Sequence, residues 1–195
     1  MPDLGRFLPL SNRPHGDESA VTADRRAQLA DLIAADAGVL AALPAPRAAA
    51  LAGEYLATAR IDPPPADDVI GGPAHSAALL ERAAATVRAG RRRGIRALAH
   101  GVRAHLRLAA AIGSPPRLPP TVTGAVALYA ATSAPFDRRA VVAGHTVRAD
   151  DDGWEFGRGP VLAGNGADIA AFLLGVSDRP PQPPARRPAT GTLEG

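Results

Sequence analysis

The sequence predicts an α+β protein in which a helical bundle precedes a small domain made of a β-ribbon and a helix. Of its 195 residues, 46% are hydrophobic but only 4% are aromatic, so small aliphatic side chains must build the core, which favours closely packed helices. Beyond residue 133 the apolar spacing changes from helical to alternating. We expect an N-terminal segment (1–20), a bundle (21–133), a small α/β domain (134–178) and a flexible Pro-rich tail (179–195) that is either mobile or laid over the surface.

The first two helices are separated by prolines. Apolar residues recur at helical spacing over residues 29–40, and Thr22 or Asp24 is suited to cap this helix. A second helix is expected over 47–59. The segment IDPPPADDVIGGP, residues 61–73, is predicted as a loop, because consecutive prolines remove backbone donors and clash with the preceding turn.

Three further helices and a ribbon complete the prediction. Helices are expected over 74–90, 95–112 and 122–131. The stretch RRAVVAGHTVRA, residues 138–149, alternates and is rich in Val, so we predict it to be extended, with DDDG as a turn and WEFG and PVLAG as short extended pieces. GRGP and GNG are expected to be glycine turns and not phosphate loops, and a capped helix is expected in NGADIAAFLLG.

Charge and cysteine content restrict the class of protein. All 22 basic residues are Arg, a bias typical of a GC-rich genome, and the net charge of +3 is small for a dedicated nucleic-acid binder. The absence of cysteine means that thiol chemistry would need a thiol cofactor. With no signal peptide and no run of about 18 apolar residues, we expect a cytoplasmic protein without a membrane partner.

The segment RALAHGVRAHLR, residues 96–107, carries two histidines on one predicted helix. At about 100° per residue, His100 and His105 lie roughly 140° apart, too far to share one metal ion. His105 falls on the apolar stripe of the helix, whereas His100 falls on the opposite face with Arg96, Arg103 and Arg107. His105 is therefore either a buried core histidine or a catalytic or ligating residue. The arginine face is either a solvated surface or a site for an anionic partner.

The second half of the chain resembles the mycothiol-dependent maleylpyruvate isomerase family. The resemblance rests on LAHGVRAHLRLAAAIG, then LPP, then APFDRRAVVAGHTVRADDDGWEFGRGPVLAG and ADIAAFLLG, and covers roughly residues 95–178. Within it, residues 152–159 match the hairpin of the family, an Asp and a Trp followed by Gly-x-Gly, and 167–174 match its closing leucine-rich helix. The resemblance implies a DinB-like bundle with a sterol-carrier-like second domain, and mycothiol as the attacking thiol.

The same resemblance implies a divalent metal, such as zinc, held by an early His and a Glu-x-x-x-His pair. His105 matches the later His, Gly101 stands where the Glu is expected, and His75 is the first His that could serve as the early ligand. With this ligand set incomplete, the resemblance also allows a diverged, metal-free site. In that reading His105 is the acid or base, and Arg103, Arg107 and His100 bind an anionic small-molecule substrate.

Three functions follow from these observations. The first is a small-molecule isomerase or thiol transferase similar to the mycothiol-dependent enzymes. The second is a non-catalytic binding or accessory protein on the same scaffold. The third, which the small net charge makes less expected for nucleic acid, is an anion or nucleic-acid binder that uses the arginine face. The oligomeric state does not follow from the sequence.

Overall fold

The computed structural model describes residues 24–64 and 73–184. Within them the chain is mostly helical, with one small three-stranded sheet, in agreement with the predicted α+β class. In chain order the elements are α1 (Arg26–Ala41), α2 (Ala45–Ala59), α3 (Pro73–Ala89), α4 (Ile95–Ile112), α5 (Pro120–Ser133), α6 (Phe136–Val142), β1 (Thr146–Ala149), β2 (Glu155–Gly157), β3 (Val161–Gly164) and α7 (Gly166–Leu173). The loop predicted at 61–73 and the tail lie partly outside the described residues.

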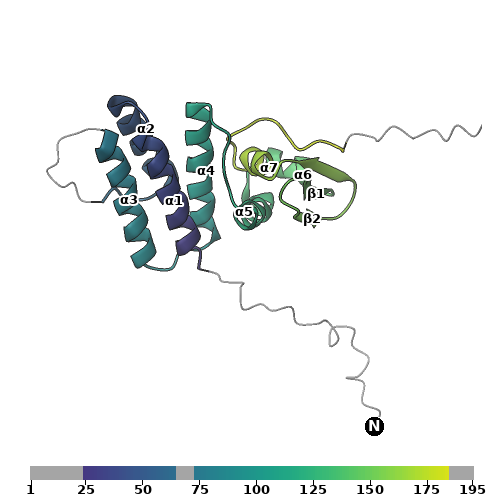
Figure 1. The fold of residues 1–195 in the computed structure, drawn as a ribbon. Helices are drawn as coiled ribbons and strands as arrows, with labels where there is room; N and C mark the ends of the chain where they lie inside the picture. Colours follow the sequence, from purple (N-terminus) through teal and green to yellow (C-terminus); the bar gives the residue numbers. More distant parts are fainter. Residues whose placement is uncertain (1–23, 65–72, 185–195) are drawn as a thin grey trace, which may run out of the picture.

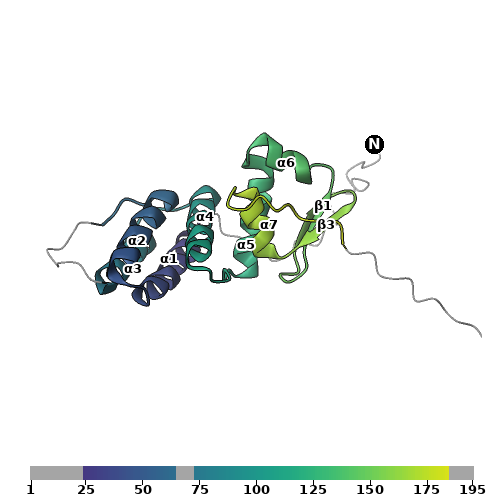
Figure 2. The ribbon, with the colours of Figure 1, turned by 90° about the horizontal axis from the view of Figure 1, so that it is seen from above.

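Helices α1 to α4 form one bundle around an aliphatic core. α1 packs against α3 and α4, and α2 packs against the same two helices. The core side chains lie at helical spacing on each partner, for example Leu29 and Ile33 of α1, Leu80 of α3 and Leu98 of α4, each at most 1% exposed. Figures 1 and 2 show α4 standing between the other bundle helices and the C-terminal elements.

Helix α5 belongs to two cores. Val122 and Val126 pack into the bundle core, whereas Ala127 and Ala130 belong to a second core with α7 and the sheet. α5 therefore joins the bundle to a C-terminal lobe, which we define as residues 136–182. No helix in the described part of the chain is long and apolar enough to span a membrane.

The sheet has the order β2-β1-β3, with β1 antiparallel to β2 and parallel to β3. The prediction that residues 138–149 are all extended was wrong over 138–142, which belong to α6. Pro135 supplies the N-cap position and Asp137 lies in the first turn, where its negative charge favours a helix. The extended pattern begins only after Gly144, whose φ of +74° turns the chain into β1.

The DDDG segment is a turn, as predicted, and its side chains also contact neighbouring elements. Asp152 accepts hydrogen bonds from the buried hydroxyl of Thr123 on α5 and from Trp154 Nε1. Its neighbour Asp151 accepts from the backbone N–H of Gly166, at the start of α7. The predicted cap of α7 is confirmed, since the Asn165 side chain accepts from the backbone of Ala167 at 3.1 Å. These contacts tie α5, the hairpin and α7 together.

The chain beyond α7 is attached to the lobe at least as far as Gln182. Arg138 donates to the backbone oxygens of Phe172 and Ser177, at 2.6 Å each, and forms an ion pair with Asp178. Gln182 exchanges two backbone hydrogen bonds with Ala163 of β3. Residues 179–182 therefore follow the second of the two expected arrangements, in which the Pro-rich tail is laid over the surface, and Gln182 is held there by its bridge to β3.

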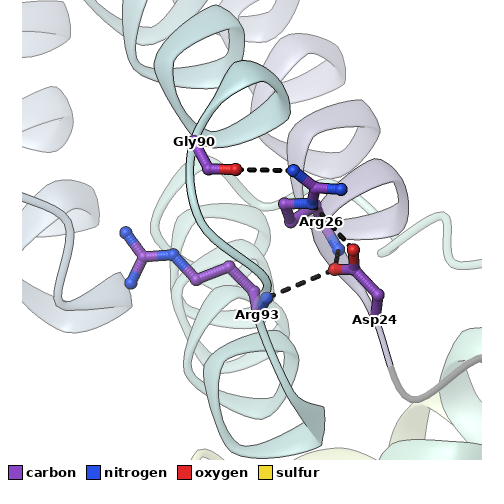
Figure 3. A network of polar contacts seen from close by, with 4 residues as sticks. All are labelled: Asp24, Arg26, Gly90 and Arg93. Carbon is purple, nitrogen blue, oxygen red and sulfur yellow. Dashed lines mark hydrogen bonds and ion pairs between the residues drawn. The ribbon is translucent and has the colours of Figure 1, made fainter.

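The N-terminus of the bundle is fixed by Asp24, one of the two predicted capping residues. Its carboxylate accepts hydrogen bonds from the backbone N–H groups of Arg26 and Arg93 and pairs with the Arg26 side chain, which in turn donates to the backbone oxygen of Gly90 (Figure 3). Desolvation raises the pKa of Asp24, but these hydrogen bonds and the Arg26 charge outweigh it, so the pKa lies below its ordinary value of 3.8.

We expect Asp24→Asn to destabilise the protein at neutral pH but not at low pH. A carboxylate whose pKa is lowered by folding stabilises the fold above its unfolded pKa, and that contribution is lost as the pH falls through the lowered value. Urea unfolding of wild type and variant from pH 7 to pH 3 should show the difference in free energy shrinking. Asp62→Asn, which removes an exposed carboxylate, is the control. A difference that stays constant with pH would contradict this interpretation.

Candidate functional site

The predicted inward histidine is confirmed. Helix α4 begins after Gly94 and ends at Gly113, whose φ of +68° closes it, so its bounds equal the predicted 95–112. His105 lies among the buried side chains of this helix and is 8% exposed. Because Leu98 and Val102 precede it on the same apolar stripe, packing against α1 determines where its imidazole points.

Asp36 of α1 is the partner of His105. Its Oδ1 lies 2.8 Å from His105 Nδ1, and the carboxylate side chain is only 2% exposed. An ionised carboxylate has no proton to give, so Nδ1 must carry the hydrogen of this bond. A neutral His105 is then fixed as the tautomer whose Nε2 is unprotonated and able to accept a proton.

Tyr55 of α2 completes the polar cluster around this pair. Burial and the negative charge of Asp36 raise the pKa of Tyr55 well above its ordinary value, so its hydroxyl remains protonated. A hydrogen bond between Tyr55 and the Asp36 carboxylate contributes to this shift, whereas His105 Nε2 is buried and has no hydrogen-bond partner in the described part of the chain. Buried polar groups are normally satisfied, so this cluster has unused hydrogen-bonding capacity in an otherwise aliphatic bundle.

A groove of about 330 Å³ adjoins the pair. Asp36 and His105 line it together with apolar side chains of α1 and α4, and its other wall is the segment that links α4 to α5. This segment contributes Ser114 and the exposed Arg117. A mostly apolar groove with a few converging polar groups is the usual form of a small-molecule site. Arg117 provides a positive charge at its edge.

The residues do not fit the three-ligand metal site that the family resemblance implies. A Cβ on Gly101, where the Glu is expected, would overlap the Leu29 side chain, because α1 packs directly on this glycine. His75 lies on α3, which packs against α1 and α2. Among residues 24–64 and 73–184, no three His, Asp or Glu side chains are grouped as metal ligands.

The predicted substrate-binding residues lie on a different face from His105. None of Arg103, Arg107 and His100 lines the groove at Asp36. Arg107 lines a very small hollow between α2 and α4, and the Arg103 guanidinium reaches Gly175 of the C-terminal lobe. The structure therefore separates the inward imidazole from the arginine face.

Sequence reasoning did not identify Asp36, Tyr55 or Arg117. A signal for Asp36 was present: it follows Leu29, Leu32 and Ile33 at helical spacing, so a carboxylate stands on the buried stripe of α1. Arg117 lies between prolines, and nothing local indicates that its loop returns to the α1–α4 groove.

No family model, no curated protein and no solved structure matches this chain. Any function must therefore be argued from the site itself.

Proposed function

We propose that this protein is a small-molecule enzyme in which His105 transfers a proton to or from a ligand bound in the groove between α1 and α4. The observation that carries the proposal is the buried Asp36–His105 pair at the edge of a groove of about 330 Å³. A carboxylate on one ring nitrogen orients the imidazole and stabilises its protonated form, which is the usual arrangement around a histidine acid or base.

Arg117 and Ser114 would orient the substrate. The guanidinium of Arg117 suits a carboxylate, so we propose an anionic small molecule with its charged group near the α4–α5 link. Since the chain has no cysteine, a nucleophilic thiol would have to arrive as a cofactor. In line with the family resemblance, we propose an isomerase or thiol transferase that uses mycothiol. Because Leu29 occupies the space beside Gly101, we derive no step through a metal ion.

Conversion of maleylpyruvate in the presence of mycothiol tests this function. We expect activity in the wild type, a loss of at least about a hundredfold in kcat/KM for His105→Gln, and a raised KM for Arg117→Gln. Arg158→Gln, which removes an equal charge from the exposed turn after β2, should leave both constants unchanged. Equal activity of wild type and His105→Gln would overturn the proposal, as would a wild type that neither converts nor binds this substrate.

A second candidate is a non-catalytic binding protein on the same scaffold. It is favoured by one observation, the lack of solvent exposure at His105 Nε2. In that case maleylpyruvate or mycothiol would bind with measurable heat by calorimetry but remain unconverted, and His105→Gln would weaken binding without any kinetic effect to measure.

A further inference from the structure

A cluster of cationic side chains lies where the end of α2, the face of α4 and the C-terminal lobe meet. It consists of Arg60, which follows α2, and of Arg96, His100 and Arg103 on α4; Arg107 extends it by one turn. In the part of the chain that the structure describes, none of these side chains forms an ion pair with a carboxylate.

The members of the cluster act on one another. Desolvation, followed by the charges of Arg60, Arg96 and Arg103, lowers the pKa of His100. Desolvation, followed by the charges of Arg107, Arg138 and Arg60, lowers the pKa of Arg103. Burial and the neighbouring positive charges both disfavour the charged forms of His100 and Arg103, and a bound anion would offset the repulsion between these charges.

Two polar atoms of the cluster are buried without a hydrogen-bond partner among residues 24–64 and 73–184. They are Arg103 Nε, which is a donor, and His100 Nε2, which donates or accepts according to the tautomer. Arg138, which is close to Arg103, is by contrast fully engaged by backbone oxygens and by Asp178. Arg138 is thus paired with acceptors of the lobe, whereas the Nε of Arg103 is not. The Nε of Arg103 can therefore donate to an acceptor that is not part of the described chain.

We propose that Arg60, His100 and Arg103 form a binding site for a phosphate dianion, either free or as the terminal group of a small phosphomonoester, separate from the groove at His105. His100 and Arg103 lie three residues apart on one face of α4, and Arg60 directly follows α2, which packs against α4, so donors from both segments can meet the acceptor oxygens of a tetrahedral anion. Rotation of the long, partly exposed Arg103 side chain would present its guanidinium fork to the ligand.

A small dianion fits this cluster better than a nucleic acid does. The basic face of α4 ends at Arg107, and the net charge of the chain is only +3, too small for a protein that must neutralise many phosphates at once. Gly175 of the lobe lies next to the Arg103 guanidinium. A Cβ there would lie 3.2 Å from Arg103 Nη2, so the absence of a side chain leaves room for this guanidinium against the backbone.

Binding of a dianion whose charge does not change with pH, such as sulfate, should be tighter at pH 6 than at pH 8. The charged groups that act on His100 are Arg60, which follows α2, and Arg96 and Arg103 of α4 itself. A bound dianion offsets their repulsion and favours the protonated imidazole, so binding takes up a proton. The fraction of phosphate that is a dianion falls from pH 8 to pH 6. Titration with sulfate, which stays a dianion over this range, therefore isolates the contribution of His100.

Isothermal titration of the full chain at constant ionic strength tests the proposal, with inorganic phosphate, phenyl phosphate, sulfate, maleate and a short oligonucleotide as probes. We expect phosphate or phenyl phosphate to bind, and Arg103→Gln and Arg60→Gln each to weaken binding by about tenfold or more, the loss typical of one charge-assisted hydrogen bond. Preference for phenyl phosphate would identify a phosphomonoester, and preference for inorganic phosphate the free ion. Arg103→Lys should retain part of the affinity, and His100→Gln should abolish the pH dependence with sulfate.

Arg158→Gln controls for net charge, and His105→Gln separates this site from the proposed active site; both should bind phosphate as the wild type does. Circular dichroism melting shows whether each variant is folded. Equal weakening by Arg158→Gln would mean an adventitious ion only. Unchanged binding in a folded Arg103→Gln variant, or an oligonucleotide or maleate that binds more tightly than both phosphate probes, would overturn the proposal.

Discussion

Replacing Gly159 with alanine will lower the free energy of unfolding by more than about 3 kcal/mol, mainly through the C-terminal lobe. Gly159 follows β2 with a φ of +122°, a conformation that side-chain-bearing residues rarely adopt. A Cβ at this position would also overlap the backbone carbonyl oxygen of Gly144, which cannot move without displacing the start of β1. The measurement is urea unfolding followed by Trp154 fluorescence, since Trp154 belongs to the lobe.

Gly144→Ala is the matched control for this prediction. Gly144 has a φ of +74°, but a Cβ added to it would meet no atom within 4 Å. The Gly144→Ala substitution should therefore lower the free energy of unfolding only by the penalty of the left-handed conformation, about 1–2 kcal/mol. Equal losses of unfolding free energy for Gly159→Ala and Gly144→Ala would show that the overlap of the added Cβ with the Gly144 carbonyl oxygen does not destabilise the protein.

Asp36→Ala is expected to have the second largest effect, a loss of about 3 kcal/mol in unfolding free energy. The substitution leaves His105 Nδ1 without its acceptor inside the bundle, at a position only 1% exposed, and leaves a space that apolar neighbours cannot fill. Unfolding by urea at pH 7 measures it. Asp31→Ala on the same helix removes a carboxylate whose pair with Arg88 is exposed, and should cost less than about 1 kcal/mol.

A double-mutant cycle separates the pair from the cavity. With Asp36→Ala, His105→Leu and the double variant, we expect the losses to be non-additive by about 1 kcal/mol or more, because each single variant already removes the hydrogen bond. Additive losses would mean that Asp36 and His105 are buried side by side without stabilising one another.

The local rules of the sequence were sufficient for the bundle and for the orientation of α4. The period of its apolar residues, ended by Gly113, predicts both its bounds and the inward side of His105, since a helix places residues by rotation alone. The turns DDDG and GRGP were also predictable, because glycines at positive φ mark them. α6 was missed because the pattern at 138–149 spans two elements divided at Gly144.

The candidate site depends on contacts that no local pattern contains. Asp36 and His105 are 69 residues apart in the chain, and they meet because α1 packs directly on Gly101 of α4. Likewise, Arg60 joins the face of α4 only because α2 and α4 pack together. Such pairings follow from the packing of whole helices, which a periodicity within one helix does not determine.

The protonation state of the His105 ring tests the central claim most directly. Long-range ¹H–¹⁵N correlation spectra at pH 9, with the His105 signals assigned by their loss in His105→Gln, report which ring nitrogen carries the proton. If Asp36 orients this imidazole, Nδ1 is protonated and Nε2 is free. A ring whose Nδ1 has lost its proton, as in an ordinary solvent-exposed histidine, would contradict the account.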